Sequence, residues 1–106
     1  MSKVLIWLAS GDRSKLMPGV LWGVNAKRFE WVDEVRFVVF GESERLVLND
    51  DELFSMIHEV QGPLFCRHVA EQEGTVEALE KKGAEVVYVG QPIAEAIKEG
   101  YTILTF

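Results

Sequence analysis

The sequence predicts an α/β protein built on a five-stranded, mostly parallel sheet. Short apolar runs, typical of strands that are buried on both faces, alternate with segments in which apolar residues recur at helical spacing. Glycine, proline and helix-capping residues separate the two kinds of segment. The resulting order, βαβαβαβαβ, requires crossover connections between strands, and these favour parallel pairing.

Five segments are predicted as strands. The first two are nearly continuous apolar runs, and the third begins with Pro63, whose missing N–H is tolerated at the first position of a strand. The predicted strands are residues 3–9, 34–40, 63–66, 85–89 and 101–106.

Helices are predicted between these strands. In the first, residues 15–29, Ser14 is the expected N-cap, Pro18 lies near the first turn, and Gly23 indicates close packing. Residues 42–48 fit either a loop or a short irregular stretch that leads into the next helix. The remaining predicted helices cover residues 51–60, 67–72, 76–82 and 92–99.

Three details of the later helices are also predicted. Thr75 is expected to cap the helix of residues 76–82, and Gly83 to follow its C-terminus. Pro92 suits the first position of the last helix. The predicted buried stripe of that helix consists of Ile93, Ala94 and Ile97.

Length and composition predict one soluble domain over residues 1–106. Hydrophobic residues make up 48% of the chain and charged residues 26%, a balance that excludes disorder. The net charge of −6 opposes binding to nucleic acid and to anionic membranes. The chain begins without the apolar stretch of a signal peptide and contains a single cysteine, so we expect a cytoplasmic protein.

Ligands of open parallel sheets bind beyond the carboxyl ends of the strands. Four predicted turns follow strand ends and meet at this edge. They begin at Ser10, Gly41, Cys66 and Gly90. The candidate ligand-binding residues at the mouth of a pocket here are Ser10, Gly11, Gly41 and Gly90.

Cys66 is the candidate catalytic residue. It ends a predicted strand and precedes a helical turn, where unpaired N–H groups and the positive end of the helix dipole favour a thiolate. Arg67 and His68 follow and would add positive charge. Such a thiol suits a nucleophile or a carrier of sulfane sulfur. The other interpretation is packing, because free cysteine is among the most buried residue types.

No metal or cofactor is expected. His58, His68 and Cys66 are too few for a closed structural zinc site, and their spacing fits no zinc motif. His58 is predicted to lie on a helix surface. The turn of residues 10–15 lacks the second glycine and the lysine–hydroxyl end of a phosphate loop, so a capped turn is favoured over an anion site.

The tryptophans leave two interpretations open. Trp7, Trp22 and Trp31 all fall in the first third of the chain, and Trp22 lies off the main apolar stripe of its helix. A tryptophan that faces outward indicates an interface, whereas one that faces inward fills the core.

The second half of the chain resembles a known family. Residues 90–106 read Gly-x-x-x-Ala-Glu-x-Ile-x-Glu-Gly-Tyr-x-x-Leu-x-Phe, and residues 82–89 read Lys-Gly-Ala-Glu-Val-Val-Tyr-Val. With an apolar first strand and one cysteine at the end of the third, this pattern is similar to the DsrE/DsrF-like (DsrEFH) sulfur-relay superfamily. The layout agrees over the whole chain, and the motifs are most specific over residues 63–106.

The resemblance implies a three-layer α/β/α sandwich with a five-stranded parallel sheet, flavodoxin-like in layout. It also implies a homo-oligomer, often a trimer or hexamer, and no cofactor. In members with sulfur chemistry, the cysteine after the third strand accepts and passes on persulfide sulfur. Only Cys66 occupies that position here, flanked by Phe65 and Arg67 where smaller residues are frequent.

The leading hypothesis is therefore a small cytoplasmic protein that carries or relays sulfane sulfur as a persulfide on Cys66. Its partners would be sulfur donor and acceptor proteins, with no nucleic acid and no membrane. The alternative is a non-catalytic oligomeric module that binds a small anion or nucleotide in the strand-end pocket. A third hypothesis is a structural subunit whose exposed Trp22 or Trp31 contacts a partner chain.

Overall fold

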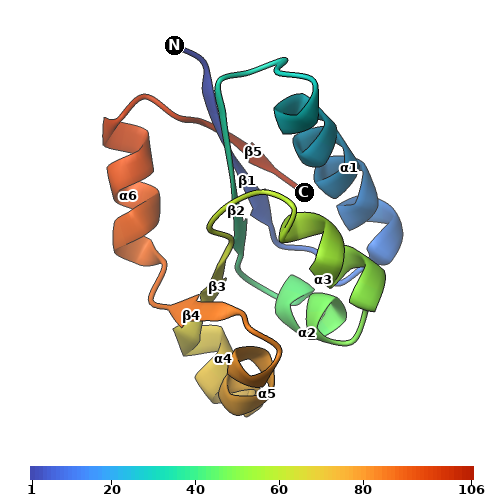
Figure 1. Cartoon of the computed structure of the whole chain (residues 1–106). Helices are drawn as coiled ribbons and strands as arrows, with labels where there is room; N and C mark the ends of the chain where they lie inside the picture. The colour runs from blue at the N-terminus through green and yellow to red at the C-terminus, as the bar shows by residue number, and fades with distance from the viewer.

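The computed structural model describes all 106 residues, and its five strands pair in parallel throughout (Figure 1). The order across the sheet is β4-β3-β2-β1-β5, so β1 lies between β2 and β5. The strands are β1 (Lys3–Leu8), β2 (Glu34–Val39), β3 (Leu64–Cys66), β4 (Glu85–Val87) and β5 (Thr102–Thr105). The helices are α1 (Arg13–Arg28), α2 (Ser43–Leu48), α3 (Asp51–Ile57), α4 (Arg67–Glu73), α5 (Val76–Lys81) and α6 (Gly90–Lys98).

Helices cover both faces of the sheet, which confirms the predicted three-layer α/β/α sandwich (Figure 1). Successive strand residues point to opposite faces, so Ile6 and Leu8 enter the larger core, whereas Leu5 enters the smaller one. The larger core lies under α1, α2 and α3, and α6 packs on the smaller core through Ile93 and Ala96. None of the helices combines the length and the apolar character needed to cross a bilayer.

Helix α1 begins earlier than predicted. Asp12, not Ser14, is its N-cap, and the Asp12 carboxylate accepts a hydrogen bond of 2.9 Å from the Ser14 N–H. Aspartate is at least as good a cap as serine, and its position two residues upstream starts the helix at Arg13. Pro18 is consequently the sixth helical residue, beyond the first turn where the sequence placed it.

The undecided stretch of residues 42–48 forms a helix, α2. Thr75 occupies the N-cap position of α5 but makes no capping bond, because its hydroxyl donates to the carbonyl of Ala70 at 3.4 Å. Gly83 follows the C-cap of α5 at φ +94°, as predicted for a left-handed C-terminal residue.

The bounds of the C-terminal elements differ from those that the sequence predicted. Strand β4 ends at Val87 because its only neighbour, β3, offers three residues for pairing. Helix α6 starts at Gly90, which makes Pro92 its third residue. The buried face of α6 consists of Ile93 and Ala96, so the predicted stripe is wrong for Ala94 and Ile97, both of which are exposed.

The close packing predicted at Gly23 is confirmed. A Cβ atom on Gly23 would lie 2.4 Å from Cδ1 of Ile6 and 2.6 Å from Cζ of Phe37. Both side chains are fully buried, so α1 approaches the sheet as closely as it does because residue 23 has no side chain.

Candidate functional site

The predicted ligand-binding residues lie where strands end. Ser10 and Gly11 follow β1, Gly41 follows β2, and Gly90 begins α6 after β4. Gly41 adopts φ +135°, and a Cβ there would lie 2.7 Å from the carbonyl oxygen of Ala9. The turn after β2 therefore requires glycine, which fixes the direction in which α2 leaves the sheet.

Cys66 is the last residue of β3 and the N-cap residue of α4. Its side chain makes no capping hydrogen bond, and the residue is 3% exposed. It packs into the smaller core with Leu5, Val38, Val89, Ile93, Ala96 and Tyr101. This burial agrees with the packing interpretation and sets a condition on the catalytic one: the thiol must become accessible before it reacts.

The structure directs Arg67 toward acidic side chains of α4 and α5. Its Nε lies 3.5 Å from the carboxylate of Glu71, and its Nη1 lies 3.9 Å from that of Glu80. Glu71 also accepts hydrogen bonds from the hydroxyl of Tyr88 at 2.9 and 3.1 Å. His68 is exposed on α4. The guanidinium of Arg67 is thus engaged by carboxylates.

Sequence reasoning missed Glu44, the second residue of α2. Its side chain is fully buried, and neither carboxyl oxygen has a hydrogen-bond partner. Burial, followed by the nearby charge of Glu73, raises the pKa of Glu44 to about 8. The backbone amides of Gly41 and Cys66 act in the opposite direction without reaching hydrogen-bond geometry. The carboxyl group of Glu44 is therefore mostly protonated at neutral pH, beside the backbone of Cys66.

One signal in the sequence points to Glu44. It precedes Val47 by three residues, the spacing that puts two side chains on one helical face. Ser43, Glu44 and Val47 are the buried residues of α2. The signal was hidden because residues 42–48 could not be assigned to a helix.

Glu73, on α4, is the carboxylate that acts on Glu44. One oxygen, Oε2, lies 3.2 Å from Nη2 of Arg45, while Oε1 is buried without a partner. Arg45 therefore balances the charge of Glu73 but forms no ion pair with Glu44. Together these residues make a buried acid that holds a proton next to a second carboxyl group, which is paired with Arg45.

A cleft of about 600 Å³ opens at the same edge of the sheet. Its lining contains three carboxylates and one guanidinium, a balance that attracts cations rather than anions. Gly11 is the predicted ligand-binding residue that lines it, whereas Ser10, Gly41 and Gly90 do not. The lining residues are Gly11, Glu42, Arg45, Leu46, Asn49, Asp50 and Glu73. A second cleft, of about 500 Å³, lies at the opposite edge, beside Glu34 and Leu64 at the starts of β2 and β3.

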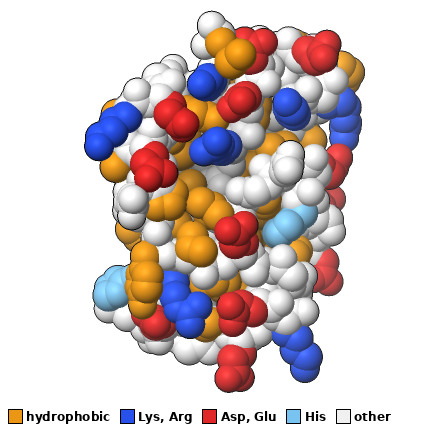
Figure 2. All heavy atoms as spheres, turned by 60° about the vertical axis from the view of Figure 1, so that its left-hand side comes forward, with side chains coloured by type: hydrophobic (Ala, Val, Ile, Leu, Met, Phe, Trp, Pro, Cys, Tyr) orange, Lys and Arg blue, Asp and Glu red, His pale blue; other side chains and the backbone are white.

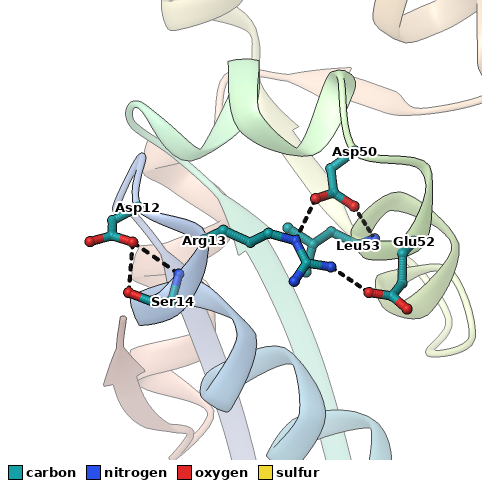
Figure 3. Close-up of polar contacts among 6 residues, drawn as sticks. All are labelled: Asp12, Arg13, Ser14, Asp50, Glu52 and Leu53. Carbon is teal, nitrogen blue, oxygen red and sulfur yellow. Dashed lines mark hydrogen bonds and ion pairs between the residues drawn. The ribbon is translucent and has the colours of Figure 1, made fainter.

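The turn of residues 10–15 is a capped turn, the interpretation that the sequence favoured. Figure 3 shows the carboxylate of Asp12 over the start of α1, accepting from the N–H and the hydroxyl of Ser14. These hydrogen bonds lower the pKa of Asp12. The side chain of Arg13 points away and reaches Asp50, at 2.7 Å, and Glu52 (Figure 3). A protein carboxylate thus occupies the position that an anion would take.

The polar contact of His58 lies within its own helical segment and not at Cys66. His58 is exposed at the C-cap of α3, where its Nδ1 donates to the carbonyl of Phe54 at 2.7 Å and its ring stacks on that of Phe54. No group of three or more His, Cys, Asp or Glu side chains is placed to hold a metal ion.

The tryptophans divide between core and surface. Trp7 stacks on Phe40 and donates its indole N–H to the Phe40 carbonyl at 3.0 Å. Trp22 is half-buried, whereas Trp31 is 57% exposed and forms an aromatic cluster with Trp22 and Phe29. This cluster is an exposed apolar surface on the α1 side of the sheet.

The face that carries α6 is also partly apolar. Figure 2 shows hydrophobic side chains gathered across its middle, with charged groups above and below. Tyr88 and Ile97 are exposed, and the side chains that pack only partly against the smaller core are Trp7, Phe40, Leu64, Val69, Val87 and Ile103.

The fold and the site define a class of protein: a three-layer α/β/α sandwich with a parallel sheet and a buried cysteine at its carboxyl edge. The conserved protein of unknown function BT1422 from Bacteroides thetaiotaomicron has the same fold, with a TM-score of 0.86 and 23% identity over 99% of this chain and 95% of that one. The protein of unknown function MTH1491 from Methanobacterium thermoautotrophicum is similar, with a TM-score of 0.57 and 18% identity over 100% of both chains. No protein-family model matches the sequence, and no curated protein does.

Proposed function

We propose that this protein carries sulfane sulfur as a persulfide on Cys66 and passes it to an acceptor thiol. The observation that carries the proposal is the place of Cys66. The only cysteine of the chain ends β3, an interior strand next to the edge strand β4, on the side where open parallel sheets bind their ligands. The resemblance of residues 63–106 to the DsrE/DsrF-like superfamily supports the same role.

The chemistry is a thiol–persulfide exchange without net oxidation. The Cys66 thiolate attacks the outer sulfur of a donor persulfide, R–S–SH, and forms Cys66–S–SH while the donor leaves as the thiolate R–S⁻. In the second half, an acceptor thiolate attacks the outer sulfur of Cys66–S–SH, and Cys66 leaves as its thiolate. Each half forms one S–S bond and breaks one, so no cofactor is required.

Burial makes access to Cys66 the controlling step. The side chains of α6 that cover the smaller core are Ile93 and Ala96, so a displacement of α6 is the movement that would open the thiol. Local openings of this kind occur in folded proteins at free energies below that of global unfolding. The persulfide would be shielded from solvent between transfers.

The protein is proposed to work as a cytoplasmic homo-oligomer, a trimer or hexamer. Parallel sheets are normally covered on both faces, and on one face of this sheet α6 is the covering helix (Figure 1). The partly exposed apolar side chains around α6 are the surface that a second copy would bury. Residues of a neighbouring subunit would then lie near the β3–α4 junction.

The alternative of an anion- or nucleotide-binding module has less support. Asp12 occupies the start of α1, and the lining of the cleft at this edge is mostly acidic. Both features oppose a negatively charged ligand.

The test is intact mass spectrometry after incubation with inorganic polysulfide. The wild-type protein is expected to gain the mass of one sulfur atom, which a reductant removes, and the Cys66→Ser variant is expected to gain nothing. A folded wild-type protein that gains no sulfur, or a Cys66→Ser variant that gains as much, would overturn the proposal.

A further inference from the structure

The cleft of about 500 Å³ at the amino edge of the sheet lies at the opposite end of β3 from Cys66. Its walls are the first residues of β2, the end of α1 and the segment that leads into β3. The charged side chains of its lining are Lys27, Glu34 and Arg36, two cations and one carboxylate. The lining therefore carries a net positive charge, although the charge of the whole protein is −6.

Neither cation of this cleft has an acidic partner. Every arginine of the chain except Arg36 forms an ion pair with a carboxylate, and the guanidinium carbon of Arg36 lies 4.9 Å from the centre of the Tyr101 ring instead. Lys27 donates a hydrogen bond to the backbone carbonyl of Asp33 at 3.3 Å. Glu34 accepts from the hydroxyl of Tyr101. Both cations are therefore available to an anionic group.

The backbone of β2 is open along the same cleft. Glu34 donates its N–H to the carbonyl of Ser2, which precedes β1, at 3.1 Å. Backbone groups of successive strand residues face opposite neighbours, so those of Val35 face β3, which pairs only with residues 38 and 39 of β2. Val35 lines the cleft and makes no hydrogen bond outside the ladders. Its N–H and C=O are thus unpaired, like those of an edge strand.

The sequence before β3 explains why this edge is open. Pro63 has no N–H to donate to β2. Gly62 adopts φ +75°, in the left-handed region, which turns the chain out of the line of the strand. Strand β3 consequently has three residues, against six in β2.

We propose that this cleft binds a ligand in which a carboxylate lies next to a secondary amide, the chemistry of a peptide C-terminus. The carboxylate would lie between Arg36 and Lys27, and the amide N–H would donate to the carbonyl of Val35 as in an added strand. This binding site is separate from the sulfur exchange and goes beyond it.

The placement of the two cations favours a ligand in the plane of the sheet. Arg36 lies over Tyr101, which belongs to the smaller core under α6. Lys27 belongs to α1, on the opposite face (Figure 1). The cations thus flank the open edge at Val35 from both sides. The C-terminus of this chain is not the ligand, because the carbonyl of Phe106 accepts from the backbone of residues 9 and 10 at the other edge.

The first test compares two ligands on the wild-type protein by calorimetric titration. One is the peptide N-acetyl-alanyl-leucine with a free carboxylate, and the other is its C-terminal amide. The acid is expected to bind at least about tenfold more tightly, because charge-assisted hydrogen bonds are the stronger ones. Equal affinities, or an acid that does not bind at millimolar concentration, would overturn the proposal.

The second test places the ligand in the cleft. Arg36→Gln is expected to weaken binding of the acid by about tenfold and to leave binding of the amide unchanged. Lys81→Gln removes one positive charge at an exposed position of α5 and is the matched control, with no effect expected. An equal loss in both variants would show a long-range effect of net charge and contradict the site. In the wild type, the acid should shift the amide NMR signal of Val35, and an unmoved signal would also contradict it.

This proposal and the carrier function fail separately. Cys66→Ser is expected to bind the acid as tightly as the wild type, because Cys66 lies at the other end of β3. A protein that binds the acid but gains no sulfur keeps this site and loses the carrier function, and the reverse result does the opposite. Loss of binding in a folded Cys66→Ser variant would overturn the location of the site.

Discussion

The raised pKa of Glu44, about 8 against 4.5 for a free glutamate, links the stability of the fold to pH. Above pH 4.5 the folded state keeps a proton that the unfolded chain has released. The free energy of unfolding therefore falls as pH rises from about 4.5 to about 8 and levels off above pH 8. Glu44 accounts for a fall of up to about 5 kcal/mol over this range.

Glu44→Gln is expected to flatten this dependence, because the amide remains neutral at every pH in the range. The variant should be more stable than wild type at pH 8 and close to wild type at pH 5. Urea unfolding at both values measures the difference, with Glu77→Gln as the exposed control. A wild-type protein whose stability does not fall over this range would contradict the assignment of a neutral Glu44.

At the scale of single residues, the sequence predicted the position of Cys66 but not the importance of Glu44. The composition and the single cysteine directed attention to Cys66, and its place at the end of β3 was predicted correctly. Glu44 was missed because its importance arises from burial between α2 and α4, and burial of a charged residue type runs against the expectation from sequence. Arg67 was assigned to the thiol, whereas its closest charged partners are Glu71 and Glu80.

Among the elements, the contact of α1 with the sheet depends on Gly23. Gly23→Ala would place a methyl group against the fully buried Ile6 and Phe37. The expected loss is about 1 to 3 kcal/mol of unfolding free energy from overpacking, reduced by the better helix propensity of alanine.

The matched control is Gly90→Ala, where a Cβ atom would meet no neighbour within 4 Å. That substitution is expected to be neutral or slightly stabilising, because alanine restricts the unfolded chain. Thermal unfolding of both variants provides the comparison. If Gly23→Ala is as stable as Gly90→Ala, the close approach of α1 to the sheet is not needed.

Element types were predictable, but several boundaries were not. Hydrophobic periodicity placed every strand in its segment, because buried strands need apolar residues on both faces. The ends depend on partners: β4 stops where β3 stops, and α1 starts where Asp12 can cap it. The exposed position of Ile97 also depends on how α6 is rotated over the sheet. The hydrophobic pattern of α6 alone does not determine this rotation.

For the molecule as a whole, the proposed oligomer predicts that one substitution on the surface of α6 weakens the assembly. Ile97→Glu puts a charge on the exposed apolar surface of α6 and is expected to lower the assembly mass in sedimentation at micromolar concentration. Leu21→Glu makes a comparable change on α1, on the other side of the sheet, and should leave that mass unchanged. A wild-type monomer would refute the oligomer, and a loss with Leu21→Glu alone would move the interface to the α1 side.

A carrier must give up its sulfur as well as accept it, so the decisive measurement follows one sulfur atom through both halves of the exchange. The protein would be loaded with isotopically labelled polysulfide, freed of excess reagent and mixed with a peptide that contains one cysteine. We expect the label to appear as a persulfide on the peptide while the protein returns to its original mass. Label that stays on the protein, or leaves only as sulfide, would contradict a relay through Cys66.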